Sequence, residues 1–380
     1  MHLRRAATLL ILALVVVLSP AAPAAWARPA QPGTISFIKA SKTSLTLNWP
    51  SVSGAGAYEV FMSTREATPY TNKVKRVSGS GATIGGLAPG RTYCFQVRAL
   101  AGSSVGYKGG HACKPTIRTL APIGGKSYSV MTFNACSDAC SGWTSRRWSA
   151  RDMVATRRPD VLALQEAGAW EVPPPGYAAT YFKSAKRLFY KTSRFSLASG
   201  RAGSITLSPS RYAVWAELVD RATYKRIIFV SAHTSPALSD YPLRGREVDN
   251  LLARMKQINT GGREVIYAGD FNSNKNRGTW SASTGFGSQD TVARRFAASG
   301  YYDAYDLART LDRPNWNSFS SLSAIPTTSK VWGDHVDHVF VRPARTNIWR
   351  WMNASLYSGS RYTTPKPSDH NPVQVNLYIP

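Results

Sequence analysis

Acidic residues are scarce in this 380-residue chain. Asp and Glu together number 21 against 47 Lys and Arg, so the formal net charge is +26 at pH 7. Charged residues make up only 18% of the chain, and 43% of it is hydrophobic. That is a globular composition, which excludes a mainly disordered, collagen-like or coiled-coil chain. The positive charge favours a polyanionic partner such as nucleic acid, an anionic membrane or a cell-surface polymer, although an exported protein can also be basic without one.

Long apolar runs are also scarce, since the chain has one near its start and no second. This run spans residues 6–18, follows Arg4 and Arg5, and leads through a Pro/Ala stretch to Ala25-Trp26-Ala27. A positive start, a short apolar segment and an A-x-A site predict a secretory signal peptide over residues 1–27. The run is shorter than the roughly 20 residues of a spanning helix. We therefore expect a secreted, extracellular protein without a stable membrane span, with an uncleaved anchor as the alternative.

Cysteine is limited to four residues, Cys94, Cys113, Cys136 and Cys140. An even count in an exported chain favours two disulfides. Their spacing favours Cys94–Cys113 and Cys136–Cys140, although four cysteines allow three pairings. A zinc site built from all four is less favoured, because the two pairs fall in different predicted domains.

Residues 31–119 have an all-β pattern. Apolar and polar residues alternate over 45–49 and 58–61, and Gly/Ser-rich turns separate the apolar runs. Leu87, Pro89, Gly90 and Tyr93 form a Leu-x-Pro-Gly-x-x-Tyr segment that resembles the tyrosine corner of a fibronectin type III domain. With Trp49 on an early strand, the segment fits an immunoglobulin-like sandwich. We expect a module that binds a cell-surface or polymer ligand, or that acts as a passive spacer.

Residues 120–127 are read as a Pro/Gly linker, and residues 128–380 as a mixed α/β domain. Residues 28–119 carry a net charge of +10 and residues 120–380 carry +14, so charge alone does not locate a site. Several apolar runs of the second part end in a polar residue. They end at Asn134, Glu166, His233 and Asp270, with Asn272, Asp337, Asp369 and His370 in similar positions. Because buried strand ends meet at one edge of a sheet, these side chains predict a catalytic site.

Each of these residues has a structural alternative when taken alone. Glu166 could cap a helix, His233 could be a core histidine, and Gly269-Asp270-Phe271-Asn272 could be an ordinary Asx turn. Asp369 and His370, before Asn-Pro, could form a simple turn, and His335 and His338 are read as structural residues without a catalytic role. The order of all the residues within one domain is what favours a catalytic interpretation.

This order resembles the endonuclease/exonuclease/phosphatase superfamily over roughly residues 127–380. The matching segments include Pro-Asp-Val-Leu-Ala-Leu-Gln-Glu at 159–166, Gly-Asp-Phe-Asn at 269–272 and Ser-Asp-His-Asn-Pro-Val at 368–373. The resemblance implies an α/β two-sheet sandwich flanked by helices. It also implies a metal-dependent phosphoric ester hydrolase, a class that includes deoxyribonucleases, abasic-site endonucleases, sphingomyelinases and inositol-polyphosphate phosphatases.

Chemistry and resemblance together give each residue an expected role. Glu166 is the main ligand of Mg2+ (Mn2+ and Ca2+ are alternatives), with Asn134 beside it and Asp369 as a further ligand. His370 pairs with Asp337, and Asp270 and Asn272 orient the attacking water and the phosphate. His233 is expected to protonate the leaving oxygen, although sequence leaves open which histidine is acid and which is base. Arg211 contacts phosphate or is a surface residue.

Two features set expectations for the substrate. The sequence around His233 reads Ser-Ala-His-Thr-Ser-Pro, closer to deoxyribonuclease-like members than to sphingomyelinase-like ones, and no clear apolar membrane loop is present. We therefore expect a nuclease acting on DNA or RNA. The alternatives are a lipid or small-molecule phosphodiesterase or phosphatase on the same scaffold, and a non-catalytic cell-surface binding protein. Oligomeric state, base preference, and endo- or exo-cleavage are left open.

Overall fold

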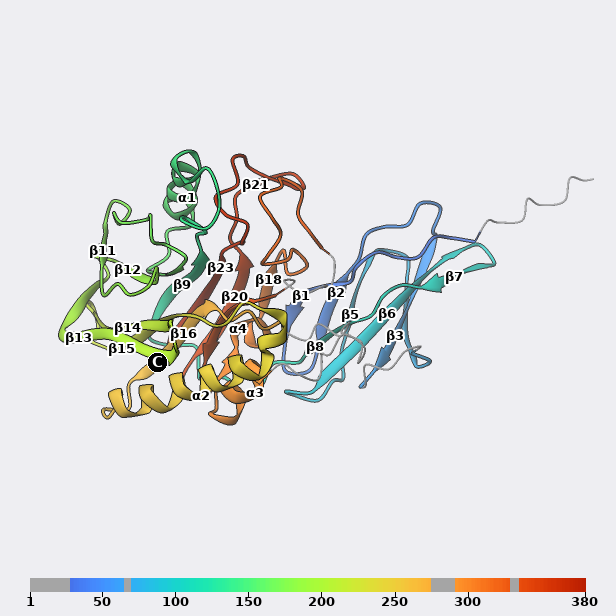
Figure 1. Cartoon of the computed structure of the whole chain (residues 1–380). Helices are drawn as coiled ribbons and strands as arrows, with labels where there is room; N and C mark the ends of the chain where they lie inside the picture. Colours follow the sequence, from blue (N-terminus) through green and yellow to red (C-terminus); the bar gives the residue numbers. More distant parts are fainter. Residues whose placement is uncertain (1–27, 65–69, 275–290, 329–334) are drawn as a thin grey trace, which may run out of the picture.

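The computed structural model describes residues 28–64, 70–274, 291–328 and 335–380. The predicted signal peptide, residues 1–27, lies outside the described residues. Two sheets face each other in the second part of the chain, and a smaller all-β sandwich precedes them (Figure 1). The fold class expected from the sequence is therefore confirmed.

The first sheet of the α/β part is built around two parallel strands, β9 (Lys126–Asn134) and β10 (Val161–Gln165). β9 begins within the stretch read as a linker. On one side of this pair lie β12 (Arg187–Lys191) and β11 (Tyr177–Ala179), and on the other lie β23 (Val373–Ile379), β20 (Asn347–Asn353) and β18 (Thr310–Asp312). The residues of β10 are all buried, which explains why its sequence is a continuous apolar run rather than an alternating one.

The second sheet has the order β13-β14-β15-β16-β19-β17. Its strands are β13 (Phe195–Ser208), β14 (Arg211–Asp220), β15 (Arg226–His233), β16 (Glu264–Asp270), β19 (Asp337–Val341) and β17 (Tyr302–Asp303). β15 and β16 are parallel neighbours, as β9 and β10 are in the first sheet. A pair of parallel strands in each sheet therefore delivers its carboxyl ends to one edge of the sandwich.

Apolar clusters hold these layers together. Val130, Val214 and Phe229 belong to the cluster between the two sheets. Helix α1 (Trp143–Arg157) packs Met153 and Val154 on the outer face of the first sheet. Helices α2 (Tyr241–Ile258) and α3 (Thr291–Ala298) cover the outer face of the second sheet. The two sheets with helices on their outer faces are the sandwich that the resemblance implied. The remaining short elements are η1 (Leu238–Asp240), α4 (Ala304–Leu307), β21 (Tyr357–Ser358) and β22 (Arg361–Tyr362).

The N-terminal module is a sandwich of two sheets. One contains β1 (Ser36–Ala40), β2 (Leu45–Asn48) and β5 (Gly81–Ile84); the other contains β4 (Lys73–Val77), β3 (Ala57–Ser63), β6 (Thr92–Ala101), β7 (Ser104–Lys108) and β8 (Ala112–Pro115). Trp49 and Tyr58 pack edge to face in its core, with ring centroids 5.5 Å apart. The Tyr93 hydroxyl accepts a hydrogen bond from Ala88 N at 2.9 Å, which is the tyrosine corner that the sequence predicted.

The module and the α/β part share a sheet. β1 pairs with β18, so the first sheet continues through β1, β2 and β5 into a ten-stranded sheet (Figure 1). Lys114 of the module also donates to the Tyr305 carbonyl at 2.5 Å and lies over the Tyr305 ring. This pairing was not predicted, because β18 is only three residues long and strand pairing depends on a complementary edge elsewhere in the chain.

Both expected disulfides, Cys94–Cys113 and Cys136–Cys140, are present. Across the described parts of the chain, we find no helix with the length and apolar character needed to span a membrane.

Candidate active site

The parallel strands deliver the predicted polar residues to one edge of the sandwich. β9 ends at Asn134, β15 at His233 and β16 at Asp270, while Glu166 directly follows β10. Glu166 has a left-handed backbone with φ of 46°, which is uncommon for a residue other than glycine and is often found at functional sites. The structure thus brings four residues from two sheets together at a single edge.

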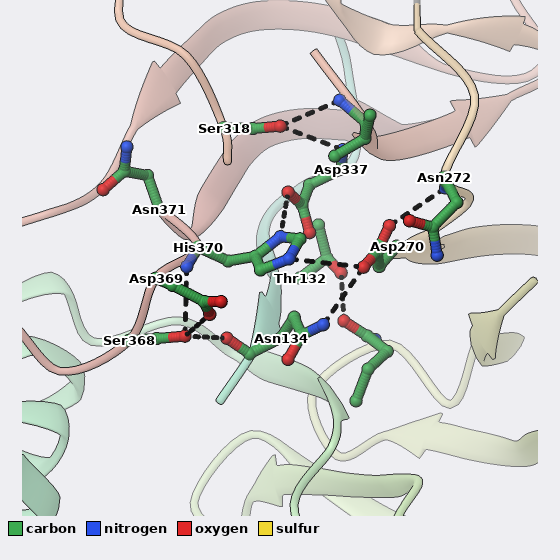
Figure 2. Close-up of polar contacts among 12 residues, drawn as sticks. Thr132, Asn134, Asp270, Asn272, Ser318, Asp337, Ser368, Asp369, His370 and Asn371 are labelled. Carbon is green, nitrogen blue, oxygen red and sulfur yellow. Dashed lines mark hydrogen bonds and ion pairs between the residues drawn. The ribbon is translucent and has the colours of Figure 1, made fainter. Parts of the chain in front are cut away.

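Asp270 lies at the centre of this group (Figure 2). Its Oδ2 accepts a hydrogen bond from Asn134 Nδ2 at 3.0 Å and lies 3.6 Å from Nε2 of both His233 and His370. Burial, together with repulsion from the Asp337 carboxylate, raises the pKa of Asp270 to about 7, although His370 opposes this shift. Asp270 is therefore a buried carboxyl that can exchange a proton near neutral pH.

His370 and Asp337 form the expected pair. Nδ1 of His370 lies 2.9 Å from Oδ2 of Asp337, and both side chains are buried. Burial by itself lowers the pKa of His370, but the carboxylates of Asp337 and Asp270 outweigh burial and raise it to about 10. His370 is therefore cationic at neutral pH and can donate a hydrogen bond or a proton from Nε2.

His233 differs from His370 in its surroundings. Its Nε2 lies 3.8 Å from Glu166 Oε1, and the side chain is buried. Burial and then the positive charges of Lys186 and Arg211 lower the pKa of His233 well below its usual range. His233 is therefore neutral at neutral pH.

Asn134 and Glu166 are the residues expected to bind a metal ion. Asn134 Nδ2 donates to Glu166 Oε1 at 3.0 Å as well as to Asp270, while Asn134 Oδ1 accepts from Cys136 N. The Glu166 side chain is 28% exposed, and no Lys or Arg of the described residues forms an ion pair with it. The carboxylates of Glu166 and Asp270 both contact the Asn134 amide nitrogen, and carboxylate oxygens are the hard donors that a divalent cation prefers, so the Glu166 carboxylate fits the expected metal.

The Asn272 side chain lies beside Asp270. Asn272 N donates to Asp270 Oδ1 at 2.9 Å, and its amide nitrogen donates to the Thr234 carbonyl at 3.1 Å. The Asx turn that was the structural alternative is thus present, and it also fixes Asp270 within the site. The structural and the functional interpretations of this segment are therefore compatible.

Asp369 is connected to the other site residues through Ser368. Its Oδ1 accepts from Ser368 Oγ, and that hydroxyl also donates to the Asn134 carbonyl at 2.7 Å (Figure 2). An oxygen of Asp369 also lies within 4.8 Å of the sulfur atoms of the Cys136–Cys140 disulfide. Among the described residues, no contact joins the Asp369 carboxylate to Glu166 or Asp270. Its role as a metal ligand therefore stays a prediction.

Several positioning residues were missed by the sequence reasoning. The Ser318 hydroxyl accepts hydrogen bonds from the backbone N–H groups of Val336 and Asp337. The Asn371 amide donates to Asn317 O, Ser320 Oγ and Tyr362 Oη. Only position 371 carried a signal, because it belongs to the Ser-Asp-His-Asn segment. Ser318 lies in an irregular segment with no pattern that predicts its partners.

Comparison with known proteins agrees with this geometry. Residues 131–370 match the endonuclease/exonuclease/phosphatase family model, and residues 30–110 match the fibronectin type III domain. No curated protein matches the chain.

Solved structures share the fold. A family member from Bacteroides thetaiotaomicron is 20% identical with a TM-score of 0.53, and the match covers 67% of this chain and 98% of that chain. A mannosyl-6-phosphatase from the same species is 18% identical with a TM-score of 0.52, covering 66% and 100%. The human Nocturnin catalytic domain with bound sulfate is 19% identical with a TM-score of 0.51, covering 67% and 94%. The chain therefore belongs to the endonuclease/exonuclease/phosphatase family of metal-dependent phosphoric ester hydrolases and carries a fibronectin type III domain ahead of its catalytic part.

Proposed function

We propose that this protein is an exported, Mg2+-dependent phosphodiesterase that hydrolyses nucleic acid. The observation that carries the proposal is the cluster of Asp270, Asp337 and His370 beside the carboxylate of Glu166, at an edge reached by two sheets. Phosphodiester hydrolysis needs an activated water, a neutralised phosphate charge and a proton for the leaving oxygen. This cluster supplies groups suited to each need.

Glu166 is the main residue that would hold the metal, with Asn134 beside it and Asp369 as a further ligand. The metal, when bound, neutralises phosphate charge and polarises the phosphoryl oxygen. Mn2+ and Ca2+ are alternatives with the same preference for oxygen ligands. Asn134 holds Glu166 and Asp270 at fixed separation through its amide nitrogen, so it also acts as a positioning residue.

The two histidines take opposite roles in this proposal. His370, cationic between Asp337 and Asp270, donates a hydrogen bond to phosphate or a proton to the leaving oxygen. His233, kept neutral, accepts the proton of the attacking water. The low pKa of His233 is the reason for reversing the expectation that it protonates the leaving group. Asp270 and Asn272 orient the water and the phosphate from the strand end.

Nucleic acid is favoured over lipid because residues 120–380 carry a net charge of +14, and positive charge supports sequence-independent binding to a phosphate backbone. The second candidate is a phosphomonoesterase, favoured by the similarity in fold to a mannosyl-6-phosphatase. Export is supported by the predicted signal peptide and by two disulfides. The fibronectin type III module is proposed to bind a cell-surface or polymer ligand.

A substrate panel tests the proposal. Mature protein is incubated with plasmid DNA, RNA, sphingomyelin and soluble phosphate monoesters, each with Mg2+ or with EDTA. We expect cleavage of DNA or RNA that EDTA abolishes and that Glu166→Gln reduces by about 10^3-fold or more. Glu171→Gln is the matched control, because Glu171 is exposed and lies outside the site. Turnover of sphingomyelin or monoesters alone, or turnover in EDTA, would contradict the proposal.

A further inference from the structure

Two basic side chains beside His233 lack acidic partners. Lys186 is only 5% exposed and Arg211 is partly buried. Within residues 28–64, 70–274, 291–328 and 335–380, neither the Lys186 ammonium nor the Arg211 guanidinium has a hydrogen-bond or ion-pair partner. A nearby acid, Glu247, instead accepts hydrogen bonds from Ser208 Oγ and Ser235 N. Glu166 and Asp138 act on Lys186 only through space, and no carboxylate of the described residues forms an ion pair with either cation. The arrangement therefore leaves two positive charges available to a ligand that supplies negative charge.

Strand register shows where Lys186 points. Leu164 of β10 lies opposite Arg187 of β12, so continuing the register places Lys186 opposite Gln165. Cross-strand neighbours share a face of the sheet. Gln165 donates to Ser231 Oγ on β15 at 2.8 Å, so that face looks toward the second sheet. Lys186 therefore projects between the sheets, near the end of β15.

Arg211 approaches the same place from the second sheet. It is the first residue of β14, where Ala213 lies opposite Ala232 of β15. Continuing this register places the start of β14 beside His233 and Thr234. The positive charges of Lys186 and Arg211 both lower the pKa of His233, and Arg211 also lowers that of Lys186, which agrees with their proximity. Two cations from different sheets thus converge on the β12–β14 side of His233.

We propose that Lys186 and Arg211 form a subsite for a second phosphate of the substrate, next to the phosphate being cleaved. The assignment rests on the proposed nuclease function and names its substrate class: a chain of linked phosphodiesters or a diester that bears a terminal phosphate. In the proposed function, the scissile phosphate binds at the cluster of Glu166, Asp270 and His370. The positive charge of Lys186 is then available to a neighbouring phosphate of the substrate. A choline headgroup, which carries a positive charge, would be repelled there.

Binding measurements separate this subsite from the catalytic cluster. The affinity of the whole protein for thymidine dinucleotide with and without a 5′-phosphate is measured in EDTA, where turnover is not required. We expect the 5′-phosphate to improve affinity about 10- to 100-fold, as a hydrogen bond to a charged group does. Lys186→Gln should remove this gain, and Lys186→Arg should keep most of it. Lys183→Gln is the matched control, because the Lys183 side chain is exposed and its ammonium lies over the Tyr212 ring, while its pairing with Lys186 uses backbone groups that the substitution keeps.

The outcomes are distinct. Arg211→Gln gives a second variant, at a less buried position, and should also reduce the gain. Equal affinity of the wild-type protein for the two dinucleotides would overturn the subsite, as would a gain that survives Lys186→Gln. Cleavage of bis(p-nitrophenyl) phosphate, which has a single phosphate, is assayed in parallel with Mg2+. If bis(p-nitrophenyl) phosphate is not cleaved, the proposed function is contradicted, while the binding measurements still test the subsite. If Lys186→Gln lowers the cleavage rate equally for this substrate and for the phosphorylated dinucleotide, Lys186 acts at the scissile phosphate and the subsite is overturned.

Discussion

Two Asp–His pairs lie on opposite faces of the same strand, β19. Asp337 pairs with His370 at 2.9 Å in the active site, while the next residue, His338, pairs with Asp303 at 2.7 Å in the core. Successive side chains of a strand point to opposite faces, so one strand serves both pairs. The four side chains are buried to a similar degree. The distance within a pair and its burial therefore do not distinguish catalysis from structure.

The second nitrogen of each imidazole makes the difference. In the core pair, His338 Nε2 lies 2.8 Å from the Ser273 carbonyl, and the ring packs on Phe271 and Phe340. Both nitrogens of His338 are therefore occupied by acceptors within the protein, and His335 Nε2 lies 3.4 Å from the same Asp303 oxygen. In the site pair, His370 Nε2 faces Asp270 at 3.6 Å, beyond hydrogen-bond distance. An imidazole can act on substrate only where its second nitrogen is left available.

The largest effect is expected from a variant that breaks the Asp337–His370 pair. Asp337→Asn removes the charge that orients and supports His370, so we expect kcat to fall about 10^3- to 10^4-fold, as in other His–carboxylate pairs. Thermal unfolding should change by only a few degrees, because the amide keeps the size of the side chain and can still accept from Nδ1. Steady-state kinetics on the cleaved substrate and a melting curve measure both. A variant with near-normal kcat would show that this pair is structural too.

Breaking the core pair should give the reverse result. Asp303→Asn removes the buried carboxylate that contacts His338 and His335, which should cost about 2–3 kcal/mol. That corresponds to a fall in Tm of roughly 5–10 °C for a domain of this size. We expect kcat of the folded fraction to stay within about threefold, since the side-chain contacts that Asp303 makes in the described part of the chain include His335, His338 and the Tyr305 backbone, on the core side of β19. A kcat loss that matches the loss in Asp337→Asn would remove the distinction between the pairs.

Glu264 shows what burial does to a carboxyl group for which the described residues provide no histidine partner. Glu264 begins β16, the strand that ends at Asp270, and burial raises its pKa from 4.5 to about 7. The unfolded chain ionises this group first, so the folded state loses stability as pH rises from about 4.5 to about 7, and the loss is complete above that range.

Glu264→Gln should remove this dependence. We expect the variant to gain about 1–2 kcal/mol relative to the wild type above pH 7 and almost nothing near pH 4.5. Melting curves of both proteins across this pH range measure the difference. A difference that does not vary with pH would mean that Glu264 keeps its ordinary pKa in the folded protein.

The sequence predicted the site pair but not the core pair. The pairing of Asp337 with His370 was implied by the family resemblance, since Asp337 begins a strand rather than ending an apolar run. The strand ends at Asn134 and His233 follow from buried apolar runs that end in polar residues. His338 was read as a structural residue, yet its partner Asp303 lies 35 positions away at the end of the two-residue strand β17, where no sequence pattern indicates the contact. The same limit applies to Lys186 and to the β1–β18 pairing, since each depends on contacts distant in sequence.

The smallest expected effect tests whether support for the site pair is local. Ser318 Oγ accepts from the N–H groups of Val336 and Asp337 and so fixes the start of β19. Ser318→Ala should lower kcat about tenfold with little change in KM, a size typical of positioning residues, because Asp337 would hold His370 less firmly. Ser318→Thr, which keeps the hydroxyl, should restore most of the rate. Combined with Asp303→Asn, the losses in kcat and in Tm should add independently, because the two changes act on different faces of β19; strong coupling between them would mean that the two Asp–His pairs form one network.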